Sequence, residues 1–189
     1  MLQTPPSAQR IRLRPERPWQ EHLDLYSALF ADPAIADALW PGTRRGIRAG
    51  HRGAQVLAED IGHWQRESFG PWIFFETTTG SFVGRGGLRR TTAPGRDSVE
   101  LCYAVRSEFW GAGYGTEMAK IAVARARALG LDEIVGFTAT TNRASRRVLE
   151  KAGLHYEAIF EHAGLPHWLG RWPGSDRRSV RSGPPDHLA

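Results

Sequence analysis

The sequence predicts an α+β fold, in which a mixed, largely antiparallel sheet of six to seven strands carries helices on both faces. Short apolar segments at 72–76, 82–89 and 99–106 are separated only by brief turns, which is typical of neighbouring antiparallel strands. A glycine-rich turn then leads into an amphipathic helix that stops at Gly130, and a further strand follows at 133–139. This order of strands and helices is the basis of the predicted fold.

The segment before the first of these strands predicts mostly helix. Alternation over 11–14 predicts an opening strand that ends at Pro15. Apolar residues at helical spacing then predict helices over 18–30, 34–39 and 53–67, and Asp32 is suited to cap the second of them. Positions 41–53 are rich in Gly and Arg and predict a loop.

The segment after residue 139 predicts one more helix and a closing pair of strands. Asn142 is placed to cap a helix that ends at Gly153. Strands over 154–160 and 166–172 are expected to pair around Ala163 and Gly164. We therefore expect one domain over residues 10–172, with flexible tails over 1–9 and 173–189.

The composition is that of an ordinary soluble domain, since 41% of the residues are hydrophobic and 24% are charged. No apolar run is long enough to span a membrane, and the N-terminus lacks the apolar core of a signal peptide. Cys102 is the only cysteine, which excludes an intrachain disulfide and makes the cytoplasm the expected location. The formal net charge is +5, but the arginines are scattered, so no specific nucleic-acid interface is expected.

A glycine-rich turn joins the strand at 99–106 to the helix that follows it. Its residues are Trp110, Gly111, Ala112, Gly113, Tyr114 and Gly115. Glycine brings backbone N–H groups close to a ligand, and the start of the helix adds unpaired N–H groups and a positive dipole end. Such a turn suits a phosphate or pyrophosphate, although an ordinary strand-to-helix turn is the alternative. Thr116 and Glu117 follow, which excludes a P-loop and departs from the dinucleotide-binding fingerprint.

Several motifs in order resemble the GNAT superfamily of N-acetyltransferases. The turn matches that family's cofactor loop, Q/R-x-x-G-x-G/A, except at its first position, where Trp110 stands. The strand ELCYAV precedes the turn, and N-x-x-S-x-x-V-L-E-K-x-G, starting at Asn142, comes after it. These features look most like the branch that contains bacterial ribosomal-protein N-terminal (alanine) acetyltransferases. The resemblance covers about residues 11–171 and implies that the strands flanking the turn and its helix are parallel and splay apart.

The resemblance implies that acetyl-CoA binds at this turn as a co-substrate. Backbone N–H groups from Trp110 through Thr116 would hold its pyrophosphate. The pantetheine arm would add as an extra strand to the edge formed by Tyr103, Ala104 and Val105. Asn142 would hydrogen-bond that arm, serve as a helix cap, or do both, and Ser145 would lie near the thioester.

The implied reaction is direct attack of a neutral primary amine on the thioester in a ternary complex. Glu100 is the expected base, because the matching position in this branch is commonly acidic; a solvent-exposed strand end is the alternative reading of that residue. A backbone N–H near Val105 is expected to stabilise the oxyanion. Leu149 replaces the family's usual Tyr acid, so Ser145 is the expected proton donor to the thiolate, with Tyr103 as a second choice.

The acceptor pocket is expected to draw on Trp40, Trp72 and Arg85, although tryptophans more often fill a core. The acceptor is either a protein N-terminal α-amine or a small-molecule amine, and the sequence leaves this open. A non-catalytic acyl-CoA-binding module is the alternative function. The histidines have no metal-ligand spacing, so no metal is expected. The protein is expected to be a monomer or a homodimer.

Overall fold

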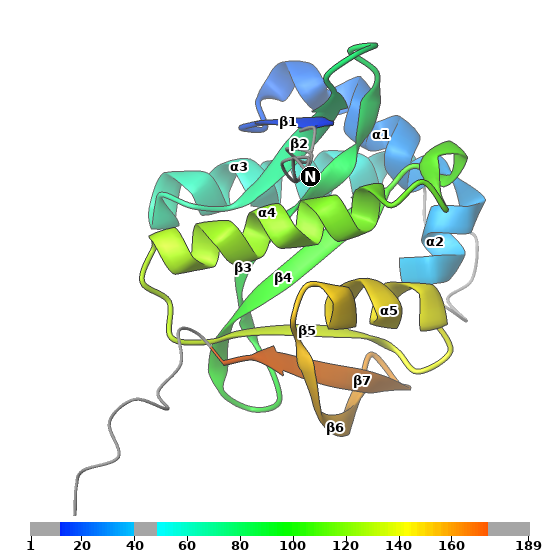
Figure 1. Cartoon of the computed structure of the whole chain (residues 1–189). Helices are drawn as coiled ribbons and strands as arrows, with labels where there is room; N and C mark the ends of the chain where they lie inside the picture. Colours follow the sequence, from blue (N-terminus) through cyan, green and yellow to red (C-terminus); the bar gives the residue numbers. More distant parts are fainter. Residues whose placement is uncertain (1–11, 40–48, 174–189) are drawn as a thin grey trace, which may run out of the picture.

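The computed structural model describes residues 12–39 and 49–173, and within them seven strands form one sheet in the order β1-β2-β3-β4-β5-β7-β6 (Figure 1). The strands are β1 (Leu13–Glu16), β2 (Pro71–Glu76), β3 (Phe82–Thr92), β4 (Asp97–Val105), β5 (Ile134–Ala139), β6 (His155–His162) and β7 (Leu165–Trp172). Neighbouring strands are antiparallel except for β4 and β5, which are parallel. The predicted mixed, largely antiparallel sheet is therefore confirmed.

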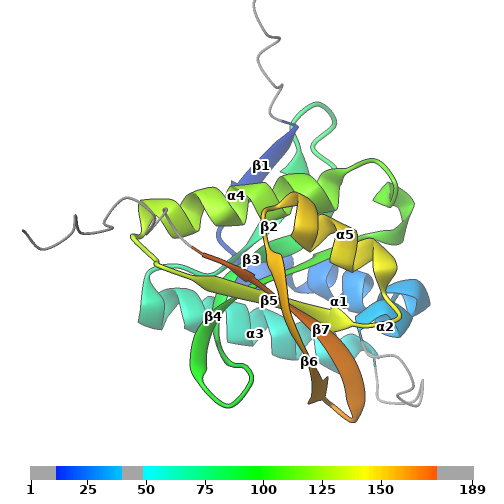
Figure 2. The same ribbon diagram turned by 60° about the horizontal axis from the view of Figure 1, so that its bottom comes forward.

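Helices cover both faces of this sheet (Figure 1, Figure 2). One face carries α4 (Tyr114–Ala128) and α5 (Arg143–Lys151), and the other carries α1 (Leu23–Ala31) and α3 (Ala49–Glu67). The short helix α2 (Pro33–Leu39) follows α1, and two 3₁₀ helices, η1 (Gln20–His22) and η2 (Ser107–Phe109), precede α1 and the glycine turn. The prediction that helices cover both faces of the sheet is therefore confirmed.

Strand β4 contributes to a hydrophobic core on each face, because successive side chains of a strand point in opposite directions. Leu101 packs with Ala122 of α4 in one core. Ala104 packs with Leu29 of α1 and Leu57 of α3 in the other. Burial on both faces fixes β4 as the centre of the sheet, and its C-terminal end leads directly into the glycine turn.

Two boundaries differ from the sequence prediction. Helix α3 already begins at Ala49, in the segment expected to be a loop. A Cβ at Gly53 would lie 2.6 Å from the Cα of Ser27, so this glycine lets α3 approach α1 closely rather than marking a loop. Strand β1 continues through Pro15, which the edge position of β1 tolerates because one side of an edge strand needs no N–H donor.

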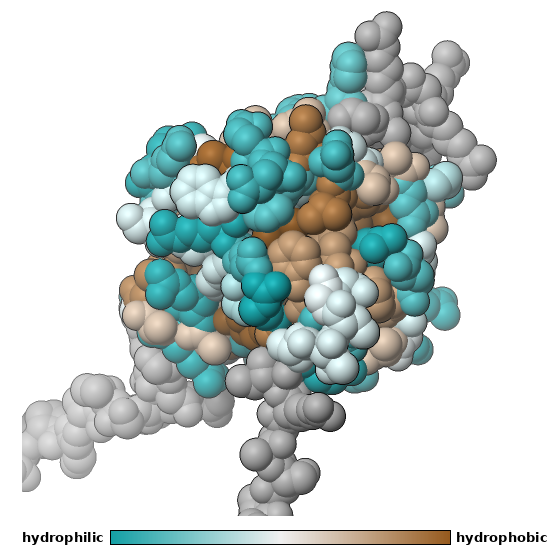
Figure 3. Space-filling view, turned by 90° about the horizontal axis from the view of Figure 1, so that it is seen from above, coloured by the Kyte–Doolittle hydropathy of each residue, from teal (hydrophilic) through white to brown (hydrophobic). Residues whose placement is uncertain are grey.

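The expected tail over 1–9, all but the first residue of the expected tail over 173–189, and Trp40 lie outside the described residues. No helix of the described part is both long and apolar enough to cross a membrane. The face seen from above carries patches of hydrophobic residues bordered by hydrophilic ones (Figure 3). Such a mixture is ordinary for the surface of a folded domain.

Candidate functional site

The glycine turn has the backbone geometry of an anion-binding site. Gly111 and Gly113 have φ angles of 79° and 85°, in the left-handed region that glycine adopts readily. Gly113 is the N-cap of α4, and its carbonyl accepts the first helical hydrogen bond, from the Glu117 N–H. The N–H groups that precede Glu117 have no partner within the helix and point out of its positive end. The turn therefore directs several backbone N–H donors toward the space beyond the N-terminus of α4.

Arg12, just before β1, forms hydrogen bonds with the backbone of this turn and with the first turn of α4. Its Nη1 donates to the Ala112 carbonyl at 3.1 Å, and its Nε donates to Glu117 Oε2 at 2.9 Å. Its guanidinium carbon also lies 4.5 Å from the centre of the Tyr114 ring. No local sequence pattern predicts this contact, because 100 residues separate Arg12 from Ala112 and 105 separate it from Glu117. Arg12 ties the first strand to the turn and adds positive charge beside it.

Strands β4 and β5 separate beyond a single aligned pair, Glu100 and Val135. The Arg106 N–H bonds to the Val83 carbonyl, so the backbone alternation turns the N–H and C=O of Val105 away from β3, toward the opening. The Val105 carbonyl accepts a hydrogen bond from Trp110 Nε1 at 2.7 Å. The splay of β4 and β5 implied by the resemblance is therefore present. The Val105 carbonyl at this opening, however, already accepts a hydrogen bond from the Trp110 indole.

The turn and the C-terminal end of β4 border a cavity of about 680 Å³, here called the turn cavity. Residues of α2 and α5 complete its wall. Two cations of α5, Arg147 and Lys151, line it four residues apart. The sequence analysis did not single out α2 or these two cations, since helical spacing alone did not show which face they occupy.

Tyr103, Asn142 and Ser145 meet at the inner end of the turn cavity. Asn142 caps α5, since its Oδ1 accepts from the Ser145 N–H at 3.0 Å, and its Nδ2 donates to the Ala38 carbonyl at 3.3 Å. The Tyr103 hydroxyl lies 2.8 Å from Ser145 Oγ and donates to the Ser145 carbonyl at 3.1 Å. Burial raises the pKa of Tyr103 to about 12, so this hydroxyl keeps its proton at neutral pH.

A second cavity of about 310 Å³, here called the charged cavity, also borders these three residues. Besides them, it shares only Ala38 and Leu39 with the turn cavity. Its other walls come mainly from α3, β3, β4, β5 and the hairpin of β6 and β7. Its ionisable side chains are Arg52, Glu59, Arg85, Arg89, Glu100, His162 and His167, with Cys102 and Tyr103 beside them. Two cavities thus meet at Tyr103 and Ser145.

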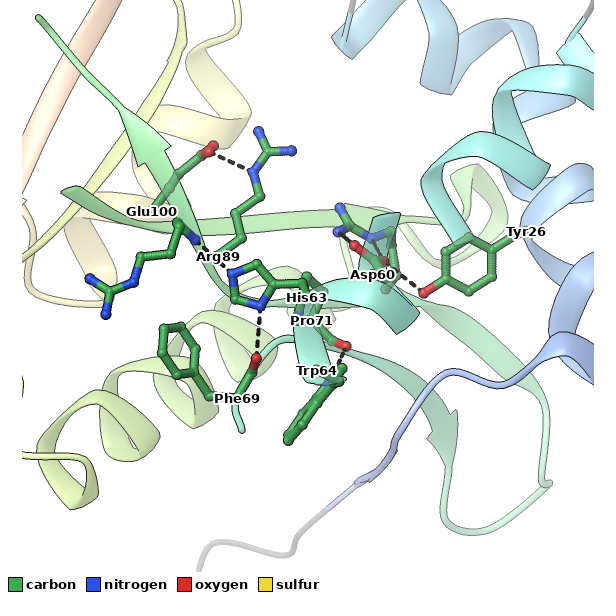
Figure 4. Close-up of polar contacts among 10 residues, drawn as sticks. Tyr26, Asp60, His63, Trp64, Phe69, Pro71, Arg89 and Glu100 are labelled. Carbon is green, nitrogen blue, oxygen red and sulfur yellow. Dashed lines mark hydrogen bonds and ion pairs between the residues drawn. The ribbon is translucent and has the colours of Figure 1, made fainter. Parts of the chain in front are cut away.

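Glu100 lies in the wall of the charged cavity and is 4% exposed, so it is not the solvent-exposed strand end considered as the alternative. It is the fourth residue of β4 rather than its opening residue, and Arg89 is its partner on β3. Arg89 Nε donates to Glu100 Oε2 at 2.7 Å (Figure 4). The negative charge of Glu100 raises the pKa of Arg89, so the two groups form a fixed ion pair.

Arg85, four residues before Arg89, also lines the charged cavity, and a carboxylate of α3 fixes its guanidinium group. Its Nε and Nη2 donate to the two carboxylate oxygens of Asp60 on α3, at 2.7 and 2.6 Å. The Tyr26 hydroxyl donates to the same carboxylate at 2.8 Å (Figure 4). This bidentate pair is buried, so it fixes the direction of the Arg85 side chain.

His63 anchors α3 against β3 in the same region. Its Nδ1 lies 2.7 Å from the Phe69 carbonyl, which only accepts, so Nδ1 carries the hydrogen. Nε2 accepts the Arg90 N–H at 2.8 Å (Figure 4). Both ring nitrogens are therefore used inside the fold, and His63 has a structural role.

Trp72 lies outside both cavities, in contrast to its expected place in the acceptor pocket. Its ring packs 5.7 Å from that of Trp64 and 6.2 Å from that of Phe74, measured between ring centres. Strand β3 separates β2 from β4 in the sheet, which keeps Trp72 away from the splayed strands. Of the three expected pocket residues, the structure brings only Arg85 to the charged cavity, and Trp40 is not described.

His162 and His167 also line the charged cavity, and the sequence analysis did not select them as site residues. They come from opposite arms of the closing hairpin, five residues apart, which carries no familiar motif. Within 12–39 and 49–173, no group of three or more His, Cys, Asp or Glu residues is placed to hold a metal ion.

Comparison with known proteins gives consistent matches. A model of the acetyltransferase (GNAT) domain matches residues 10–155. The FsC-acetyl coenzyme A-N(2)-transacetylase of Aspergillus fumigatus is 37% identical over 121 residues, which cover 60% of this chain. Those residues cover 48% of the fungal protein, so the match spans about half of that relative's length.

Two solved structures show the same fold. An acetyltransferase from Agrobacterium tumefaciens superposes with a TM-score of 0.72 at 20% identity, covering 91% of this chain and 96% of that one. The ribosomal-protein α-N-acetyltransferase RimL, in complex with coenzyme A, superposes with a TM-score of 0.68 at 14% identity. That match covers 87% of this chain and 96% of that one.

Proposed function

Because this chain belongs to the acetyltransferase (GNAT) family, we propose that it transfers the acetyl group of acetyl-CoA to a primary amine. The observation that carries this proposal is the turn cavity, in which the N-terminus of α4 faces the opening between β4 and β5. A helix N-terminus suits a pyrophosphate, and an open strand edge suits an extended amide chain. Coenzyme A carries both.

Acetyl-CoA fits the turn cavity in one direction. The N–H groups of residues 111–116 hold the pyrophosphate, whereas the Trp110 N–H donates to the Ser107 carbonyl at 3.1 Å. Arg12 lies beside the turn, and Arg147 and Lys151 line the facing wall. The pantetheine arm follows the edge of β4 past Val105, toward Asn142. This direction brings the thioester to Tyr103 and Ser145, where the two cavities meet.

The acceptor amine enters through the charged cavity and meets the thioester at that junction. Its nitrogen forms a bond to the carbonyl carbon, the C–S bond breaks, and the nitrogen loses a proton. The Val105 N–H faces the opening and is the donor placed to stabilise the oxyanion. Glu100 lies in the same cavity, where its charge attracts a protonated amine even while it pairs with Arg89. The ammonium first releases one proton to solvent, and the neutral amine that results is the nucleophile.

The departing thiolate receives a hydrogen bond from the Tyr103–Ser145 pair. The pKa of Tyr103 is about 12, whereas a thiol has a pKa of roughly 8.5. A thiolate therefore does not take the proton of Tyr103 at equilibrium, and the alcohol of Ser145 is a weaker acid still. Tyr103 donates to Ser145, so the Ser145 hydroxyl is the group that donates a hydrogen bond to the thiolate. Solvent supplies the proton, so Leu149 in place of a Tyr acid is compatible with turnover.

The first experiment measures acetyl-CoA binding by calorimetry for the wild type and for Gly113→Glu. The substitution puts a side chain and a negative charge at the place of the pyrophosphate, so binding should be lost. Gly80→Glu is the matched control, because Gly80 has a similar φ of 73° in a β2–β3 turn with no atom within 4 Å of an added Cβ. The control isolates backbone strain, and its affinity should equal that of the wild type.

The second experiment measures thiol release from acetyl-CoA over a panel of spermidine, kanamycin, free amino acids and short peptides with Ala or Ser at the N-terminus. Turnover with at least one amine supports the proposal and identifies the acceptor class. Tight acetyl-CoA binding without turnover across the panel would favour the non-catalytic acyl-CoA-binding module. No binding by folded wild type would contradict both functions.

A further inference from the structure

The nitrogen of the acceptor must lose a proton during the proposed acetyl transfer, and the charged cavity contains few groups that can take it. Glu100 was the residue expected from the sequence. Its Oε2 accepts from Arg89 Nε at 2.7 Å, and both residues lie side by side in the β3–β4 ladder. Protonating this carboxylate would break a charge-assisted hydrogen bond and leave Arg89 without its partner. The ion pair therefore opposes use of Glu100 as the base.

His167 offers a free acceptor atom in the same cavity. Its Nδ1 lies 3.0 Å from the Leu165 carbonyl, and a carbonyl oxygen only accepts, so Nδ1 carries the hydrogen. In the neutral ring the lone pair is then on Nε2, and no contact of the described residues engages that atom. The Leu165 carbonyl fixes the tautomer and orientation of the ring, as an orienting group does for a catalytic base.

The position of His167 in the fold brings it beside the splayed end of β5. It pairs with Ala139, the last residue of that strand. The Ala139 carbonyl accepts a hydrogen bond from the Asn142 N–H at 2.8 Å. His167 is therefore paired in the sheet with the residue that binds the backbone of Asn142. Trp168 points to the face of α5, which places His167 on the opposite face, where the charged cavity lies.

Three other rings surround that of His167. Its ring centre lies 5.2 Å from that of His162, and the rings of Phe137 and Phe160 lie 6.1 Å away. Burial and, to a lesser extent, the neighbouring His167 lower the pKa of His162, which favours the uncharged form of the His162 ring. The other ionisable side chains that line the cavity are Arg52 and Glu59 of α3, Arg85 and Arg89 of β3, and Cys102, Tyr103 and Glu100 of β4.

We propose that His167 is the proton acceptor of the reaction, a step that rests on the proposed acetyl transfer. As the N–C bond forms and the C–S bond breaks, the proton of the amine moves to His167 Nε2. His162, which is exposed at the end of β6, then passes it to solvent, and the ring returns to its neutral form. Glu100 attracts the amine, and His167 removes its proton.

The test compares pH profiles of kcat/KM for the wild type, His167→Asn and Glu100→Gln, with the fastest amine of the panel above. His167→Asn keeps a side-chain N–H for the Leu165 carbonyl but removes the base. We expect kcat at pH 7 to fall at least about 100-fold, the usual lower effect of losing a general base, and the acidic limb of the profile to change. Acetyl-CoA affinity should stay within about twofold, a change of less than roughly 0.5 kcal/mol.

His155→Gln is the matched control, since His155 is an exposed histidine of β6 that lines neither cavity. Its profile should equal that of the wild type. Ionisation of the free amine is the same for every variant, so only differences between profiles are compared. Unchanged kcat and an unchanged acidic limb in His167→Asn, with both lost in Glu100→Gln, would overturn the proposal.

A measurement on the wild type covers the case in which His167→Asn does not fold. A ring-nitrogen NMR titration of the free enzyme should give a His167 midpoint that coincides with an acidic limb of kcat/KM, because this ratio reports the free enzyme. The same spectra should show Nδ1 carrying the hydrogen in the neutral ring. A midpoint more than about one pH unit from every limb would contradict the proposal. Failure of the wild type to release thiol would instead reject the acetyl transfer itself.

Discussion

The two cavities meet at Tyr103 and Ser145 but are built in different ways. The anion site of the turn cavity consists of backbone N–H groups from one continuous stretch, residues 111–116. The charged cavity depends on side chains that partners distant in sequence hold in place, as Asp60 holds Arg85. A backbone site tolerates most side-chain changes but depends on glycine, whereas a side-chain site depends on each of its partners. The following variants test this difference.

Asp60→Asn should have the largest effect, because it leaves the buried guanidinium of Arg85 without a charged partner. Breaking a buried ion pair from one side costs roughly 3–5 kcal/mol. Urea unfolding followed by circular dichroism measures this loss. The acetyl-CoA affinity of the folded variant should stay unchanged, since Asp60 does not line the turn cavity.

Tyr26→Phe is the control for Asp60→Asn, because it removes only the hydroxyl that donates to Asp60 Oδ2. The loss of one such hydrogen bond costs about 1 kcal/mol. Equal losses of unfolding free energy for Asp60→Asn and Tyr26→Phe would mean that the charge of the Asp60–Arg85 pair contributes nothing. The contrast between a backbone site and a side-chain site would then lose its basis.

Arg12→Ala should weaken acetyl-CoA binding about tenfold, which corresponds to roughly 1.4 kcal/mol. The variant loses the hydrogen bond to the Ala112 carbonyl and the pairing with Glu117 that hold the turn, but the helix N-terminus remains. Calorimetry measures the change. Arg14→Ala is the control, because Arg14 pairs with Glu16 of its own strand and does not contact the turn. A similar loss in both variants would indicate that overall charge, rather than the clamp, matters.

Asp32→Ala should have the smallest effect, about 1 kcal/mol of unfolding free energy at pH 7. The carboxylate of Asp32 accepts from Ser107 Oγ at 2.5 Å and from the Ala34 N–H at 2.8 Å. These hydrogen bonds, that from Ser107 foremost, lower the pKa of Asp32 in the folded state. The carboxylate therefore stabilises the fold fully above its unfolded pKa of roughly 4, and this contribution is lost as the pH falls through the folded value.

Urea unfolding of wild type and Asp32→Ala at pH 7 and at pH 3 checks the sign of this effect. The difference between the two proteins should be smaller at pH 3. A difference that is equal at both pH values would show that the charge of Asp32 has no part in capping α2.

The sequence predicted the turn and the sheet well because their signals are local. Gly111 and Gly113, with left-handed φ angles, stand two residues apart in the chain, and the strands of the β2–β3–β4 meander follow in order. Asn142 was likewise recognisable as a cap from its position before a helix. Contacts between distant residues gave no such signal. The Arg12 clamp, the Asp60–Arg85 pair and the opening of the charged cavity toward His167 all depend on how the elements pack.

The wrong prediction for Trp72 has the same cause, namely that its position depends on how the elements pack. Composition identifies a large aromatic residue, but only the order of the strands shows that β3 separates it from the site. Glu100, a site residue expected from the sequence, lines the charged cavity, while its ion pair with Arg89 became visible only when the register of β3 and β4 was known.

The contact of Trp110 with the Val105 carbonyl has a consequence for the free protein. A strand edge with open N–H and C=O groups is a template on which a foreign chain can add and aggregate. The indole occupies one acceptor of that edge, although Trp110 is 50% exposed to solvent. Trp110 thus covers one open carbonyl of the edge. An arriving amide either displaces the indole or shares the carbonyl through its second lone pair.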